Sequence, residues 1–362
     1  MSTLQERFAS SGDIQFLSIT TDPDYDTLDI LNEYSSNYSN KNNWFFLRGD
    51  ILDVIELSEK GFFLSAALLP AGHSTRLVLV DKELNIRNIE PCDIALFSAG
   101  GVRSKEYANE FVDRGAFVID NSSTFRMNDE IPLVVYGINE NTINEKTKII
   151  ANPNCTTMAL VMALKPLHDI FKLVGIVPVS YQAVSGSGKD AVESLNNELL
   201  NLQNSGSAPD EKYYKTQIAK NVIPVAGNMT ENGYTDEEMK FSNESKKILN
   251  IPNLIVEPSN ARVGVETGHG IFCSATFEED VDVDKAIESI NLFEGVEYWA
   301  NDFPTPVDAE GNRNIFVSRM RSGLSSKKIL NFWAVGDNLL KGAALNAVQI
   351  ASYIQKNDIY SR

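Results

Sequence analysis

Cysteine is scarce in this chain of 362 residues, and long apolar runs are absent. The three cysteines, Cys92, Cys155 and Cys273, are too few and too scattered for a disulfide framework or a zinc knuckle, so we predict no metal site. No apolar run approaches the roughly 20 residues that a membrane helix needs. No signal peptide precedes Asp13. We therefore expect a protein of the cytoplasm, which is a reducing compartment, with no membrane partner.

Positive charge is also in deficit. Lysine and arginine number 32 against 49 aspartates and glutamates, which gives a net charge of −17. Such a field repels nucleic acid and anionic lipid, so neither is expected as a partner. Apolar residues make up 43% of the chain and charged residues 22%, as in globular proteins. At roughly 150 residues per domain, the length indicates two domains or three.

The first part of the chain predicts a compact β-α-β-α-β arrangement that is too short to make a comfortable domain alone. Thr27 is a suitable N-cap for its first helix. Strands are expected at residues 14–19, 44–47 and 75–81, and helices at residues 28–38 and 51–60.

From Asp93 onward, short strands alternate with helices, which is typical of βαβ units and a parallel sheet. A polar or glycine-rich cluster follows each of the strands expected at residues 93–97, 116–120 and 148–151. Functional loops of such sheets lie at the carboxyl ends of the strands, so these clusters mark the active edge. In residues 173–334 the expected strands and helices alternate differently, which predicts an inserted α+β domain. The last helix, residues 340–356, is expected to return to the first sheet.

Cys155 follows a predicted strand and begins an apolar helix. The unpaired amides and the dipole at a helix N-terminus favour a thiolate, so we expect a nucleophile with a lowered pKa. The alternative is a buried structural cysteine, which is about as common.

His269 stands between two glycines that allow close approach of a ligand, and it is the natural acid or base for Cys155. The alternative is a histidine in a surface loop. Arg262 is suited to bind a carboxylate and Arg126 a phosphate, although single arginines are more often surface residues. The stretch from Gln182 to Lys189 follows a strand and opens a helix, which suits phosphate or nicotinamide, but it is not a Walker loop.

The motifs FSAGG, VIDNSSTFRM, ANPNCTT, SYQAVSGSGK, GHG and DNLLKGAALNAVQIA occur in this order from about Asp93 to the C-terminus. In this respect the chain resembles the aspartate-semialdehyde dehydrogenases. The resemblance implies a doubly wound, Rossmann-like sheet, an inserted catalytic and dimerisation domain, and a homodimer. It also implies a small-molecule substrate, β-aspartyl phosphate, which would be reduced by NADPH through a cysteine thioester. This reaction belongs to the biosynthesis of lysine, threonine and methionine.

The resemblance also implies a role for each matching residue. Cys155 corresponds to the nucleophile, His269 to the acid/base, and Gln182 to the residue that orients the substrate. The substrate and phosphate would be bound by Arg126, Asn154, Glu237, Lys240 and Arg262. NADP would lie along Ser98, Ala99, Gly100 and Gly101 and meet Ser185, Gly186 and Asn338 at its nicotinamide end.

The front of the chain departs from that family, whose members begin with a glycine-rich turn for the dinucleotide phosphates. The glycines before residue 90 are Gly12, Gly49, Gly61 and Gly72, and none are clustered. The motifs FLSITTDPDYDT, NWFFLRGD and HSTRLVLVDKE instead resemble the Sco/SenC copper chaperones, which have a thioredoxin-like fold. His73 matches their copper-binding histidine, but their two cysteines are missing because the chain starts downstream of them, and one histidine makes a poor copper site.

We therefore predict an α/β protein made of two truncated parts. Residues 1–88 would be a partial thioredoxin-like segment, residues 91–153 with 337–362 the remnant of an NADP-binding domain, and residues 154–336 the catalytic and dimerisation domain. A fused or misassembled reading frame explains this order better than an evolved bifunctional protein. The alternatives to a dehydrogenase are an inactive remnant that cannot bind NADP and a copper or thiol-redox module. Acetyl-glutamyl-phosphate reductase is a rival that the NPNCTT and SYQAVSGSGK motifs disfavour.

Overall fold

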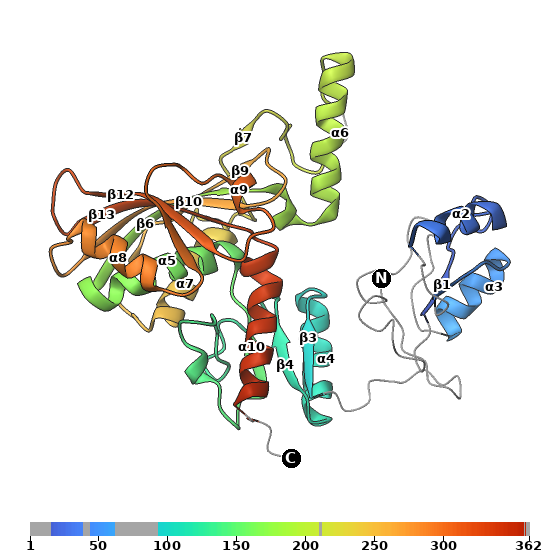
Figure 1. Cartoon of the computed structure of the whole chain (residues 1–362), viewed down its shortest axis with the longest axis horizontal. Coiled ribbons are helices and arrows are strands. Elements are labelled where there is room, and N and C mark those ends of the chain that lie inside the picture. The colour runs from blue at the N-terminus through green and yellow to red at the C-terminus, as the bar shows by residue number, and fades with distance from the viewer. Residues whose placement is uncertain (1–15, 39–43, 62–92, 210–211, 358, 360–362) are drawn as a thin grey trace. The chain divides into compact units, whose positions relative to one another are not determined.

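The computed structural model describes residues 16–38, 44–61, 93–209, 212–357 and 359. The chain divides into two compact units, residues 1–90 and residues 91–362 (Figure 1). His73, Cys92 and the strand predicted at residues 75–81 lie outside the described residues.

The N-terminal unit contains two parallel strands, β1 (Phe16–Ile19) and β2 (Trp44–Leu47). Helix α2 (Leu28–Tyr38) joins them, and α3 (Ile51–Glu56) follows β2 and continues into a π-helical turn. The Oγ1 of Thr27 accepts a hydrogen bond from the amide of Ile30, as expected of an N-cap. The helices and strands predicted for the described part of this unit are therefore confirmed.

The second unit begins with three parallel strands in the order β3 (Ile94–Phe97), β4 (Phe117–Asp120) and β5 (Ile149–Ala151). Helix α4 (Gly101–Asp113) connects the first two. The chain's last helix, α10 (Leu345–Lys356), returns to this sheet as predicted (Figure 1). Its apolar side chains share one buried cluster with those of β4 and β5: Phe117, Ile119, Ile150, Ile350 and Ile354.

The rest of the second unit is built on an eight-stranded mixed sheet. Seven strands follow the order β11-β12-β13-β10-β6-β9-β7, and β8 pairs with β6 off this path. Their bounds are β6 (Leu173–Gln182), β7 (Val222–Ile223), β8 (Ile255–Val256), β9 (Ser259–Val263), β10 (His269–Phe277), β11 (Val296–Trp299), β12 (Ile315–Ser322) and β13 (Ile329–Gly336).

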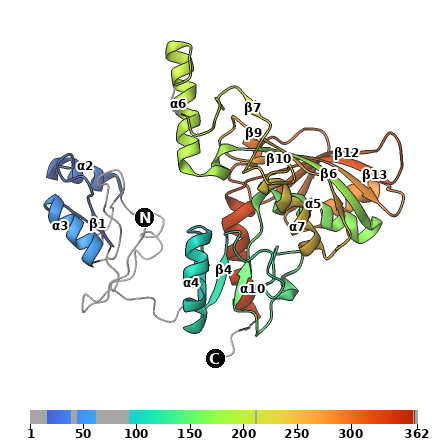
Figure 2. The same ribbon diagram turned by 180° about the vertical axis from the view of Figure 1, so that it is seen from behind.

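Helices α5 (Cys155–Phe171), α7 (Asp236–Leu249) and α8 (Val283–Leu292) pack on this sheet and enclose the largest apolar core (Figure 2). Twelve of the 17 residues of α5 are buried, including the nine that directly follow Cys155, so the position of its first residue is tightly fixed. The remaining helices are α6 (Lys189–Ser205) and the short α9 (Pro306–Ala309). Short helical turns are found at Glu140–Thr142, Val184–Ser187 and Leu340–Ala344, the last of which is π-helical and precedes α10.

Candidate functional site

Cys155 is the first residue of α5, as the sequence predicts. The side-chain oxygen of Asn154 caps this helix by accepting hydrogen bonds from the amides of Thr156, at 3.0 Å, and Thr157, at 3.3 Å. On its other side, Cys155 is covered by the turn before α10. An alanine Cβ at Gly342 would lie only 2.8 Å from the Cβ of Cys155, so this turn packs directly on Cys155.

The protonation state of Cys155 differs from our expectation. Desolvation by the surrounding protein raises the pKa of the thiol to about 11, and the negative charge of Glu237 acts in the same direction. The charges of Arg126 and Arg262 and the amide of Thr156 lower the pKa, but they do not overcome the desolvation. The prediction of a lowered pKa was wrong for this state of the protein: the residue rests as a thiol.

His269 begins β10, and its side chain is buried. Its Nδ1 accepts a hydrogen bond of 3.0 Å from the amide of Ala183, whereas its Nε2 has no partner. Burial and the neighbouring charge of Arg262 lower the pKa of the imidazole to about 3. The ring is therefore neutral near pH 7, with its proton on Nε2, which makes it a hydrogen-bond donor to whatever enters the site.

Gln182 and Arg262 lie side by side because they are register partners on the parallel strands β6 and β9. Both side chains are buried. Nη1 of Arg262 donates to the carbonyl of Ala183 at 2.7 Å, and its Nε has no partner. Nε2 of Gln182 lies 3.5 Å from Oγ1 of Thr156, the residue after the nucleophile. The pair therefore brings an amide and a cation to the site from the sheet.

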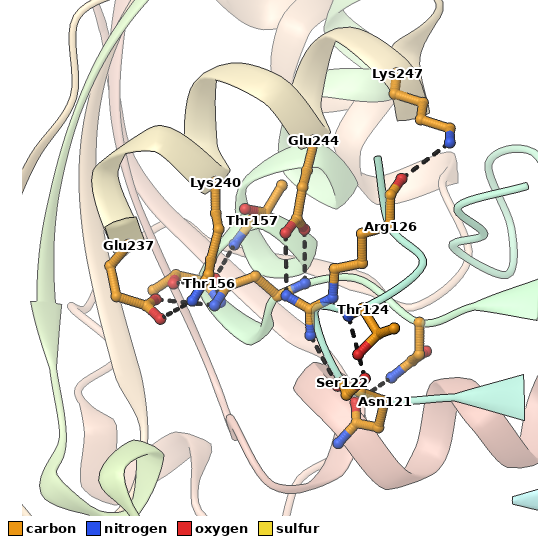
Figure 3. A network of polar contacts seen from close by, with 12 residues as sticks. Asn121, Ser122, Thr124, Arg126, Thr156, Thr157, Glu237, Lys240, Glu244 and Lys247 are labelled. Carbon is orange, nitrogen blue, oxygen red and sulfur yellow. Dashed lines mark hydrogen bonds and ion pairs between the residues drawn. The ribbon is translucent and has the colours of Figure 1, made fainter. Parts of the chain in front are cut away.

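Figure 3 shows a second polar cluster, built from α7 and from the loop after β4. The charges of two of its members, Glu237 and Arg126, act on the thiol of Cys155. Arg126 donates from Nη1 to Glu244 at 3.0 Å and from Nη2 to the carbonyl of Asn121 at 2.9 Å. Lys240 pairs with Glu237, and Glu237 also accepts a hydrogen bond of 2.9 Å from Nδ2 of Asn154. This cluster gathers four of the five residues predicted to bind substrate and phosphate: Arg126, Asn154, Glu237 and Lys240.

Ser185, Gly186 and Asn338 meet close to His269. Nδ2 of Asn338 donates to Oγ of Ser185 at 3.0 Å, and Oδ1 of Asn338 accepts from the amide of Gly268 at 2.9 Å. An added Cβ at Gly186 would lie 3.0 Å from Nε2 of His269, which is tighter than an ordinary contact, so a side chain here would press on the imidazole. The three residues predicted to meet the nicotinamide therefore lie together: Gly186 is next to the imidazole, and Asn338 joins Ser185 to the residue before His269.

The stretch from Ser98 to Gly101 follows β3 and opens α4. Gly100 is the N-cap of this helix, with φ of 86° and no side-chain cap. Nδ2 of Asn121 lies 3.4 Å from Oγ of Ser98, and Oγ1 of Thr124 donates to the carbonyl of Gly101 at 3.0 Å. These residues thus belong to the same sheet edge as the cluster around Arg126.

Two residues with structural influence on the site escaped the sequence reasoning. Glu244 bridges Arg126 and the amide of Asn154, which it contacts at 2.7 Å. Asp337 accepts hydrogen bonds from the amides of Leu339, Leu340 and Gly311, which fixes the turn over Cys155. The spacing of Glu237, Lys240 and Glu244 (i, i+3, i+7) places them on one face of α7, and this signal was available in the sequence.

In the part of the chain that the structure describes, no group of three or more histidine, cysteine, aspartate or glutamate residues is placed to hold a metal ion. No helix among the described residues is long and apolar enough to cross a membrane.

Known proteins match most of this chain. Residues 164–341 match the dimerisation domain of semialdehyde dehydrogenases, and residues 64–146 match their NAD-binding domain. An aspartate-semialdehyde dehydrogenase from Corynebacterium glutamicum is 44% identical over 284 residues, which are 74% of this chain and 82% of that protein. The chain belongs to the aspartate-semialdehyde dehydrogenase family.

Other members of this family are similar to the chain over comparable lengths. The enzyme of that name from Bacillus subtilis is 41% identical over 303 residues, 78% of this chain and 86% of its own length. The crystal structure of aspartate semialdehyde dehydrogenase II from Vibrio cholerae, complexed with ASA, has a TM-score of 0.74 and 32% identity. The match covers 95% of this chain and 99% of that one, and it supports the Rossmann-like α/β fold with a dimerisation domain.

The extent of the family match corrects one boundary. We expected the resemblance to start at about Asp93, but the NAD-binding domain already matches from residue 64. The first 63 residues lie before this match.

Proposed function

We propose that this chain is an aspartate-semialdehyde dehydrogenase: it reduces β-aspartyl phosphate to aspartate semialdehyde and releases phosphate. The observation that carries the proposal is Cys155 at the start of a buried helix, where the charges of both Arg126 and Arg262 act on its thiol. One guanidinium suits the phosphoryl group of an acyl phosphate and the other its α-carboxylate.

The first half of the reaction follows from these groups. The sulfur of Cys155 attacks the acyl carbon, the bond from that carbon to the phosphate oxygen breaks, and a thioester forms. The thiol proton leaves with the phosphate, so that hydrogen phosphate is the product. Nε2 of His269 donates a hydrogen bond to the developing oxyanion, and Gln182 orients the acyl group. Arg126, Lys240 and Asn154 hold the phosphoryl group, Arg262 binds the carboxylate, and Glu237 lines the site.

NADP fits this site at its nicotinamide end. Ser185 and Asn338 offer polar side chains at this end of the site, and the absence of a side chain at Gly186 lets its backbone lie against His269 and Arg262. The uncapped start of α4 at Gly100 presents free amides along the path of the cofactor from Ser98 to Gly101. When bound as NADPH, the cofactor supplies the hydride that reduces the thioester.

The pyrophosphate end of NADP lacks a matching loop in the described N-terminal unit. The residues between β1 and α2 include Asp22, Asp24 and Asp26, whose charges repel phosphate. We infer that the family's glycine-rich turn is missing and that residues 1–88 derive from a Sco/SenC-like, thioredoxin-like protein. The NAD-binding domain match overlaps this segment from residue 64, and the structural match to the Vibrio cholerae enzyme, which covers 95% of this chain, takes in most of residues 1–63 as well. The inferred origin therefore rests on the motifs FLSITTDPDYDT and NWFFLRGD.

We further infer that the chain forms a homodimer in the cytoplasm. The match of residues 164–341 to a dimerisation domain supports the first of these inferences.

Trapping the acyl-enzyme tests the proposal without any need for cofactor. Freshly prepared β-aspartyl phosphate is mixed with the full chain, and peptides are analysed by mass spectrometry. We expect an aspartyl group on the Cys155 peptide, its removal by hydroxylamine, and none in the Cys155→Ser variant. An unmodified Cys155 peptide in a folded protein would contradict the proposed acyl chemistry.

A further inference from the structure

Glu244 is a buried carboxylate that bridges two parts of the site. Its side chain is only 2% exposed, and each of its carboxylate oxygens has a different partner. Oε1 accepts from Nη1 of Arg126 at 3.0 Å, and Oε2 accepts from the amide of Asn154 at 2.7 Å. The carboxylate thus joins a phosphate-binding cation to the N-cap of the helix that carries Cys155 (Figure 3).

This bridge connects helix α7 with the loops that follow β4 and β5. Arg126 lies in the loop after β4, whereas Asn154 follows β5 and precedes the nucleophile. Glu244 comes from α7, which packs against α5. A buried carboxylate without partners would be strongly destabilising, so its two bonds are obligatory in the folded protein.

The bridge also leaves part of the guanidinium available. Nη1 and Nη2 of Arg126 face protein acceptors, but Nε is buried and has no partner. A guanidinium held in this way presents a fixed edge with a free donor, as recognition of a phosphoryl oxygen requires.

We propose that Glu244 is a positioning residue for the phosphate site: it fixes the guanidinium of Arg126 relative to the start of α5 and so aims it at the phosphoryl group. The inference rests on the proposed function, because it takes Arg126 as the phosphate ligand. Two other roles make different predictions. If the carboxylate only neutralises Arg126, it weakens phosphate binding, and its removal should strengthen that binding. If it only supports the fold, its removal should not act on phosphate binding through Arg126.

Protection of Cys155 by inorganic phosphate distinguishes these roles and requires no turnover. Alkylation of Cys155 by iodoacetamide is followed by mass spectrometry of its peptide at increasing phosphate concentration. The variant is Glu244→Gln, and the matched control is Glu198→Gln. Glu198 is also a buried carboxylate that accepts two hydrogen bonds, from the amides of Ile218 and Ala219.

We expect the half-protecting phosphate concentration to rise at least about tenfold in Glu244→Gln, which corresponds to about 1.4 kcal/mol. The control should stay within about twofold of the wild type. In an Arg126→Gln background, Glu244→Gln should add no further loss, since the two residues act as one unit. If Glu244→Gln does not fold, Glu244→Asp, which keeps the charge, should show a smaller rise in the same direction.

Three results would overturn the inference. A lower half-protecting concentration in Glu244→Gln would show that the carboxylate only neutralises Arg126. An unchanged concentration, or an equal loss in the Arg126→Gln background, would show that Glu244 does not act through Arg126. If phosphate does not protect the wild-type thiol at all, the proposed phosphate site itself is wrong, and this outcome is separate from the others.

Discussion

The two units of this chain both contain short parallel strands joined by helices, yet their strand ends carry opposite chemistry. In the N-terminal unit, β1 runs into a loop with Asp22, Asp24 and Asp26. In the second unit, β4 and β5 run into Asn121 and Asn152, whose side chains hydrogen-bond to each other at 2.8 Å. The first set of ends repels anions, and the second belongs to a network that holds Arg126, whose positive charge acts on the thiol of Cys155.

This difference shows that a β-α-β arrangement does not by itself favour an anion at the ends of its strands. The site depends on which residues follow the strands, because backbone amides and small or neutral side chains are what a phosphate can approach. The chemistry that we assign to this chain therefore belongs to the second unit. The predictions below test that division.

The largest effect is expected in the second unit, from Cys155→Ser. A serine hydroxyl at this position is a far weaker nucleophile, so turnover should fall by more than about a thousandfold. The measurement is the steady-state rate with aspartate semialdehyde, NADP and phosphate. A serine variant as fast as the wild type would place the chemistry elsewhere.

The next effect concerns the cofactor. If the pyrophosphate loop is missing, the adenosine half of NADPH gains few contacts, each of which is worth about 1.5–3 kcal/mol when charge-assisted. We expect kcat/KM for reduced nicotinamide mononucleotide to lie within about tenfold of that for NADPH. A preference for NADPH of more than about a thousandfold would show that the first unit supplies a nucleotide site after all.

The pH dependence of alkylation tests the resting state of the thiol. The pKa of Cys155 is raised to about 11, so the rate constant of its reaction with iodoacetamide should rise with pH along a titration curve whose midpoint lies near pH 11. Cys273 in β10 serves as the internal control, since burial also raises the pKa of its thiol and its side chain is only 3% exposed. A plateau already at neutral pH would mean that the helix dipole outweighs desolvation.

The raised pKa also has a consequence for stability. In the unfolded chain the thiol ionises near its ordinary pKa of 9, whereas in the folded protein it stays protonated to about 11. The contribution of this thiol to the free energy of unfolding is therefore fully present below about pH 9 and is lost as the pH rises from 9 to 11.

The smallest effect on activity is expected from Trp44→Ala in the N-terminal unit. Trp44 packs with Phe16 and Phe46 in the centre of the described part of that unit. Its removal should destabilise the unit by about 3–5 kcal/mol and leave turnover within about twofold. Hydrogen exchange checks the first expectation and the steady-state rate the second. A large loss of turnover would show that the first unit participates in catalysis.

Much of the arrangement could be predicted because it is local. The strand before Cys155 and the apolar run after it marked the start of α5, and the capping residue Thr27 marked the start of α2. The meeting of Gln182, Arg262 and His269 was harder to foresee. It depends on β6 pairing with both β9 and β10, which no local pattern specifies.

The pKa of Cys155 and the role of Glu244 could not be obtained from sequence. The helix dipole is visible in the order of residues, but desolvation depends on the side chains packed around the thiol. The resulting shift upward opposed the one that the dipole alone predicts. Glu244 lies 118 residues from Arg126, so their pairing appears only once α7 is folded against the site.

The central claim is that the second unit makes this chain an aspartate-semialdehyde dehydrogenase, and the phosphate-dependent oxidation of aspartate semialdehyde by NADP tests it most directly. The full chain is purified, and reduced NADP is followed by its absorbance with and without phosphate. We expect a rate that requires phosphate and that the Cys155→Ser variant lacks. Absence of reduced NADP at saturating substrate, while Cys155 still reacts with iodoacetamide, would contradict the claim: the acyl site would be intact but unable to use the cofactor.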